Sequence, residues 1–122
     1  MKLKESLDIN GMHLENRLVM PPMATAKSDR GNVTDALCRY YAARAEGSTP
    51  GLIITEHSYI SPSGIASPNQ LSIASDSDVE GLHRLTDAIH AAGTTKVIAQ
   101  INHAGSSTYR DRKSTRLNSS HG

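Results

Sequence analysis

The chain has 122 residues, 37% of them apolar, with 13 basic and 12 acidic side chains and a formal net charge of +1. That length allows one small core but falls well short of the roughly 250 residues of a closed β/α barrel, and the balanced charge gives no reason to expect a nucleic acid or another polyanion as partner. A single cysteine excludes an intramolecular disulfide, and because no apolar run approaches the roughly 18 residues of a membrane span, a cytoplasmic protein is expected.

The chain opens with a pattern typical of a β-hairpin. Apolar residues alternate with polar ones in two short segments, 7–9 and 12–14. Asn10 and Gly11 lie between them, and this pair tolerates the positive φ angles of a two-residue turn. A hairpin over residues 6–15 is therefore predicted.

The next elements are a strand, a helix and a second strand. The apolar run 18–20 predicts the first strand, and the prolines that follow cannot donate to a sheet. Thr34 is typical of a helix N-cap, and the helix is expected to run to about Glu46, where Gly47 ends it. Leu52 begins a continuously apolar strand expected to end near Glu56, and such a strand is typical of a parallel sheet covered on both faces.

A second helix and a third strand complete the pattern. Residues 77–80 read as a capping box. The helix that follows carries apolar residues at intervals of three, three and four and ends at Gly93. Residues 96–101 form the third strand. The alternation of strands and helices predicts an α/β fold with parallel strands, although periodicity alone does not separate a barrel from an open sheet.

In parallel α/β folds, functional groups collect where strands end. Three clusters lie at such points: 21–24 after the first strand, 56–58 after the second, and 100–105 around the end of the third. Because parallel strands end at one edge of a sheet, these clusters are expected to converge on one face.

Three segments carry a resemblance to a known family: NRLVMPPMAT, YYAARAEGSTPGLIITE and LTDAIHAAGTTKVIAQINHAG. Together, over about residues 3–105, they resemble the opening of the old yellow enzyme family of NADH:flavin oxidoreductases. The resemblance implies a TIM-type (β/α)8 barrel, of which this chain would supply an incomplete N-terminal portion: the hairpin and about three β/α units. It also implies FMN as cofactor, NAD(P)H as hydride donor, and a small-molecule acceptor such as an activated alkene.

The same resemblance implies the cofactor contacts. Pro22, Met23 and Ala24 would touch the flavin, the backbone at His57 would lie near it, and Gln100 would hydrogen-bond its pyrimidine edge. An amide suits that edge because it offers both a donor and an acceptor. No catalytic residue is predicted, because the family's catalytic histidine or asparagine pair and its proton-donating tyrosine lie beyond the end of this chain.

The chain departs from the family's pattern at three positions. Ala24 stands where cysteine or threonine is often found, so a role for its side chain in tuning the flavin is not expected. His57 replaces a small residue, so only its backbone contact carries over. Ser106 stands where an arginine is usual.

Several polar residues also have structural readings. His103 is favoured as a structural histidine at a strand end over a site residue. For Glu56, a carboxylate paired within the barrel is favoured over a general base. Cys38 is expected to be a packed, unreactive thiol. No metal site is expected, because no histidines show the spacing of metal ligands and there is only one cysteine.

The C-terminal end reads DRKSTRLNSSH from residue 111 to residue 121 and does not continue the β/α pattern. It resembles the translation of a sequencing-adapter oligonucleotide. We therefore expect residues 1–110 to be the N-terminal part of the barrel and 111–122 to be a non-native tail. The competing interpretation is a basic tail that binds nucleic acid through Arg110, Arg112, Lys113 and Arg116.

Two functions remain open from the sequence. The first is the flavin oxidoreductase, with activity belonging to the longer parent, because three barrel strands alone leave unpaired edges and lack the later phosphate-binding loops. The second is a non-enzymatic α/β module that binds a partner through its loops.

Overall fold

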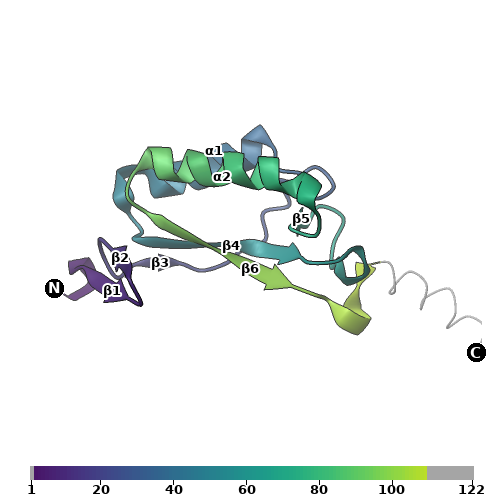
Figure 1. The fold of residues 1–122 in the computed structure, drawn as a ribbon, viewed down its shortest axis with the longest axis horizontal. Coiled ribbons are helices and arrows are strands. Elements are labelled where there is room, and N and C mark those ends of the chain that lie inside the picture. The colour runs from purple at the N-terminus through teal and green to yellow at the C-terminus, as the bar shows by residue number, and fades with distance from the viewer. Residues whose placement is uncertain (1, 110–122) are drawn as a thin grey trace, which may run out of the picture.

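A computed structural model describes residues 2–109 of the chain. A parallel sheet carries two helices on one face, and a small hairpin lies near the N-terminus (Figure 1). The segment 111–122, for which a foreign origin is expected, lies outside the described residues. No helix between residues 2 and 109 combines the length and apolar character that a bilayer span requires.

The predicted hairpin is confirmed. Strands β1 (Leu7–Ile9) and β2 (Met12–Leu14) pair antiparallel. Asn10 and Gly11 have φ angles of 47° and 85°. Positive φ at both central residues is what a type I′ turn requires, and asparagine and glycine adopt it most easily.

The sheet has four parallel strands: β3 (Val19–Met20), β4 (Leu52–Tyr59), β5 (Leu71–Ser72) and β6 (Lys96–Asn102). β4 is central. Its Ile53 lies opposite Met20 of β3 and also opposite Val97 of β6, so β3 and β6 occupy opposite edges of β4. β5 pairs with the carboxyl half of β4, beyond the end of β3.

Two features of the sheet differ from the expectation. β5 lies between the second predicted strand and the second predicted helix, where no strand was predicted, and its two residues are too few to show a pattern. β4 continues to Tyr59 instead of ending near Glu56, with an irregularity in its pairing with β6 between Ile54 and His57. Residues 57–59 of this extension pair in register with residues 100–102 of β6, and the buried Ser58 hydroxyl donates to the Glu56 carbonyl at 3.0 Å.

Helix α1 (Asp35–Ala45) begins as predicted. Thr34 has an extended backbone, and its hydroxyl accepts a hydrogen bond from the backbone N–H of Leu37 at 3.1 Å. This satisfies one of the unpaired amides of the first turn.

Helix α2 (Val79–Ala92) lies beside α1, but its capping box is not the predicted one. The reciprocal hydrogen bonds join Ser75 and Asp78, two residues earlier than expected, and they cap a short 3-10 turn, Asp76–Asp78, that leads into the helix. Asp78 also accepts from the Ser72 hydroxyl at 2.6 Å, which ties the turn to the end of β5. Residues 75–78 are two serines alternating with two aspartates, so the sequence offers several candidate caps.

The hydrophobic core lies between the two helices and the sheet. Its buried members are Leu37, Tyr41, Ala45, Ile53, Leu71, Leu85 and Ile89. Burying one large apolar side chain contributes about 1.5–3 kcal/mol, so these contacts fix the helices on the sheet. Cys38 is a free thiol, partly buried against this core.

The opposite face of the sheet is not covered by a helix (Figure 1). It exposes apolar side chains such as Val19 and Ile98. The functional groups predicted from the sequence belong to this face and to the carboxyl ends of its strands.

Candidate functional site

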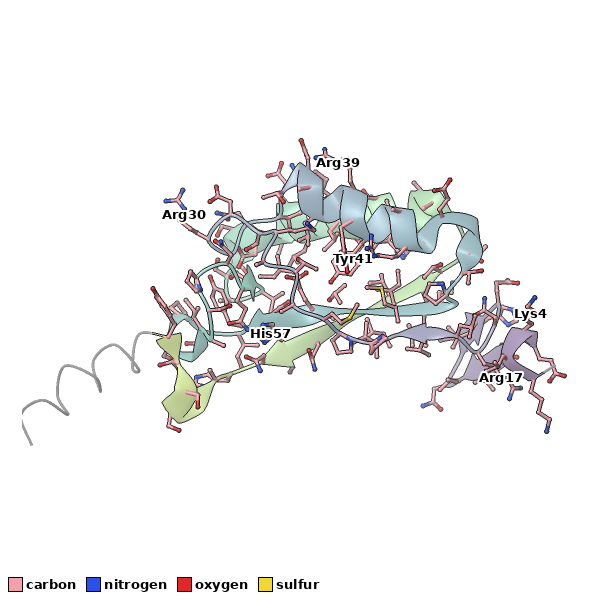
Figure 2. All side chains as sticks on the ribbon, turned by 180° about the vertical axis from the view of Figure 1, so that it is seen from behind. Lys4, Arg17, Arg30, Arg39, Tyr41 and His57 are labelled. Carbon is pink, nitrogen blue, oxygen red and sulfur yellow. The ribbon has the colours of Figure 1, made fainter. Side chains whose placement is uncertain are left out.

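The carboxyl ends of three parallel strands line one hollow of about 230 Å³. Pro22 and Ala24 follow β3, His57 belongs to β4, and Gln100 and Asn102 belong to β6. Figure 2 labels His57 in the carboxyl half of β4, on the strand that lies between the other two. The predicted convergence of the three clusters is therefore present in the structure.

His57 and Gln100 lie directly opposite each other in the β4–β6 pairing. Side chains alternate along a strand, so Gln100 shares a face with Ile98, whereas Val97 packs against the core beneath the helices. Within residues 2–109 neither the Gln100 amide nor the His57 imidazole makes a hydrogen bond. Both groups are free to bind a ligand in the hollow.

Asn102 is a lining residue that the sequence interpretation missed. Its Oδ1 accepts from Nε2 of Gln70 at 3.1 Å, and the Gln70 Oε1 accepts from the backbone N–H of Ala66 at 2.7 Å. Gln70 is buried, so this chain of bonds holds Asn102 in place. The two-residue period of β6 could have revealed Asn102, since it lies two positions after Gln100.

Four of the five predicted cofactor-binding residues line the hollow: Pro22, Ala24, His57 and Gln100. The fifth, Met23, is half exposed and is not part of the lining. It lies in the chain between two residues that do line the hollow, Pro22 and Ala24.

Glu56 points away from this hollow, toward α1. Its side chain is 1% exposed, and its Oε1 accepts hydrogen bonds from the hydroxyls of Thr25 at 2.8 Å and Tyr41 at 3.0 Å. Burial, reinforced by the Glu56 carboxylate, raises the pKa of Tyr41, so this phenol stays protonated and donating. The structure thus places Glu56 in a paired, structural setting, with hydroxyls as partners.

His103 is also held by structural contacts. Its Nδ1 accepts from the backbone N–H of Gly105 at 3.0 Å, and its Nε2 lies 3.3 Å from the Ser63 hydroxyl. The ring packs so closely on Gly64 that an added Cβ there would lie 2.6 Å from it. These contacts fit the structural reading of His103.

A larger hollow of about 440 Å³ lies elsewhere, between residues 31–33 and α2. Its polar groups serve mainly to fix loops: the Arg84 guanidinium donates to the Val33 carbonyl at 2.9 Å, and Asp78 accepts from Ser72. It is lined at the end of β5 by Ser72, but by no residue of β3, β4 or β6. No group of three or more potential metal ligands occurs in it or anywhere else in residues 2–109.

The smaller hollow fits one side of a flat heterocycle with a polar edge. Pro22 and Ala24 supply close-packing surface, and the Gln100 amide supplies an unused donor and acceptor. At about 230 Å³, the hollow is smaller than the roughly 300–1,000 Å³ that small-molecule sites usually measure.

Comparison with known proteins decides the family. The family model of the NADH:flavin oxidoreductase / NADH oxidase family matches residues 2–121. The chain belongs to this family. The match includes most of the segment 111–122, for which the sequence predicts a foreign origin.

Two relatives show how much of a family member the chain represents. It is 44% identical over 97 residues to an NADH:acrylate oxidoreductase of Vibrio harveyi, and the aligned region covers 79% of this chain and 9% of that protein. It is 40% identical over 106 residues to an NADPH dehydrogenase of Clostridium acetobutylicum, covering 86% of this chain and 31% of that one. The chain thus spans less than a third of these family members.

A solved structure of the same family supports the fold. The old yellow enzyme homologue from Zymomonas mobilis superposes with a TM-score of 0.76 at 34% identity, over 84% of this chain and 28% of that one. The predicted fold class, an incomplete N-terminal portion of a TIM-type β/α barrel, is confirmed. The uncovered sheet face corresponds to the inner face of that barrel.

Proposed function

We propose that the full-length protein carrying this segment is an FMN-dependent oxidoreductase. It takes hydride from NADH or NADPH and passes it through the flavin to a small-molecule acceptor such as an activated alkene. The observation that carries this proposal is the convergence of Pro22, Ala24, His57 and Gln100 on one hollow at the carboxyl ends of parallel strands. In β/α barrels that edge of the sheet is where active sites are built.

Different residues would contact different parts of the flavin. Pro22 and Ala24 line one side, where a small side chain allows close approach, and Met23 between them would contact the flavin through its backbone. His57, on the neighbouring strand β4, would also contribute its backbone. The Gln100 amide is suited to the pyrimidine edge, which carries donors and acceptors itself. The flavin supplies the redox chemistry, and these residues bind and orient it.

Two further proposals concern the chain itself. We infer that residues 1–110 are the barrel segment and that 111–122 are foreign to it; sequencing reads that run unbroken through codon 111 would refute this. We also infer a cytoplasmic location.

A chain of these 122 residues alone should bind FMN weakly, because the hollow it forms is smaller than an ordinary cofactor site.

The test is anaerobic reduction of the full-length protein. FMN bound to it should lose its visible absorbance when NADH or NADPH is added, and an activated alkene should restore that absorbance in proportion to the product formed. A protein that holds FMN but is reduced by neither nucleotide would contradict the proposed activity.

A further inference from the structure

The Glu56 carboxylate joins three parts of the molecule beside the hollow. Glu56 lies on β4, directly before the lining residue His57. Its Oε1 accepts from Thr25, in the segment that follows β3, and from Tyr41 on α1. Figure 2 shows Tyr41 extending from α1 toward the sheet, where its hydroxyl also accepts from the backbone N–H of Glu56 at 2.9 Å.

The segment after β3 depends on such an anchor. Residues 21–27 form no helix or strand, although Pro22 and Ala24 must hold their places in the hollow. Ala26 has a φ of 55°, in the left-handed region that a residue with a Cβ adopts at a cost in free energy. Thr25 stabilises this turn, since its hydroxyl accepts from the Lys27 N–H at 3.2 Å while it donates to Glu56.

The far end of the same segment is fastened to α1. The Thr34 hydroxyl donates to the Lys27 carbonyl at 2.6 Å while it caps the helix. The segment is thus held at Thr25 by Glu56 and at Lys27 by Thr34. Among the side-chain hydrogen bonds of residues 2–109, only the bond to Glu56 joins this segment to β4, the strand that carries His57.

We propose that Glu56 is a positioning residue for the cofactor. Its carboxylate holds Thr25 and thereby places Pro22 and Ala24 for contact with the flavin before the flavin binds. This inference rests on the proposed function. Glu56 does not touch the ligand, because its side chain is buried on the helix side of the sheet. Preorganisation of this kind strengthens binding because the segment need not be ordered when the ligand arrives.

The experiment compares Thr25→Val with Thr25→Ser in the full-length protein. Valine keeps the shape of threonine but removes the donor to Glu56, whereas serine keeps the hydroxyl. Thr86→Val, on α2 and far from the hollow, is the matched control. The readouts are the FMN dissociation constant and, without FMN, the hydrogen exchange of the peptide covering residues 20–26.

Thr25→Val should weaken FMN binding about tenfold, as expected for loss of a hydrogen bond to a charged group. It should also speed exchange in residues 20–26 of the apo-protein. Thr25→Ser and Thr86→Val should stay within about twofold of the wild type. If Thr25→Val does not fold, Glu56→Gln gives the same test, with an expected loss of about fivefold because a neutral amide accepts more weakly than a carboxylate.

The outcomes separate this inference from the proposed function. If Thr25→Val binds FMN as tightly as the wild type, or if serine fails to restore binding, the positioning role is wrong and the flavin site stands. If the wild-type protein takes up no FMN, both the positioning role of Glu56 and the proposed function are wrong.

Discussion

Tyr41 and Glu56 are joined by two hydrogen bonds of opposite direction. The Tyr41 hydroxyl donates to the Glu56 side chain at 3.0 Å and accepts from the Glu56 backbone N–H at 2.9 Å. Both residues are buried. One hydroxyl therefore serves both an acceptor and a donor of β4, the acceptor being shared with Thr25, and it fixes α1 on the sheet.

Tyr41→Phe should destabilise the full-length protein by about 1–3 kcal/mol, because it leaves a buried N–H and a buried carboxylate each short of a partner. The measurement is the free energy of unfolding in urea. Tyr40→Phe, at the adjacent, less buried ring, is the control and should cost much less. Equal effects of the two substitutions would show that the pair of hydrogen bonds contributes little.

The same pair predicts a dependence of stability on alkaline pH. Burial and the Glu56 carboxylate raise the pKa of Tyr41 above its ordinary value of about 10. The unfolded chain then releases this proton first, so the contribution of Tyr41 is complete below about pH 10 and falls as the pH rises further. The stability advantage of wild type over Tyr41→Phe should shrink as the pH rises above about 10. An advantage that grows over this range would contradict the assignment.

Thr34→Ala should cost about 1 kcal/mol or more, because the hydroxyl both caps α1 and donates to the Lys27 carbonyl. Thr34→Ser retains both bonds and should remain close to wild type. Thermal unfolding of the two variants makes the comparison. A serine variant as unstable as the alanine variant would mean that the methyl group, and not the cap, stabilises this helix start.

Gly64→Ala should displace the His103 ring, because the new Cβ would lie 2.6 Å from a ring carbon. Overpacking of this kind costs about 1–3 kcal/mol. The cost should fall when His103 is also changed to alanine, since the smaller side chain makes room. Additive effects of the two substitutions, measured by urea unfolding, would show that the close contact is not the cause.

Local sequence signals predicted most of the elements. Asn10-Gly11 determines the hairpin, Thr34 determines the start of α1, and an unbroken apolar run marks β4 as a buried parallel strand. Each of these signals depends on neighbours along the chain. β5 and the carboxyl end of β4 could not be predicted in this way, because Leu71–Ser72 and the polar residues 55–58 are held in the sheet by partners distant in sequence.

The site, too, was predictable only where local patterns indicate it. The predicted strand ends correctly brought together Pro22, Ala24, His57 and Gln100, since parallel strands end at one edge of a sheet. The bonds from Glu56 to Thr25 and from Gln70 to Asn102 join residues more than thirty positions apart in both cases. No local pattern indicates such pairs.

The most direct test of the flavin site is the equilibrium binding of FMN to the full-length apo-protein and to Gln100→Leu. We expect one FMN per chain for the wild type and binding weakened about tenfold to a hundredfold in the variant, because leucine leaves the polar edge of the flavin without its partner. Ile101→Val, the next residue on β6 but on the opposite face of the strand, should bind normally. A wild-type protein that takes up no FMN, or a leucine variant that binds it unchanged, would contradict the account.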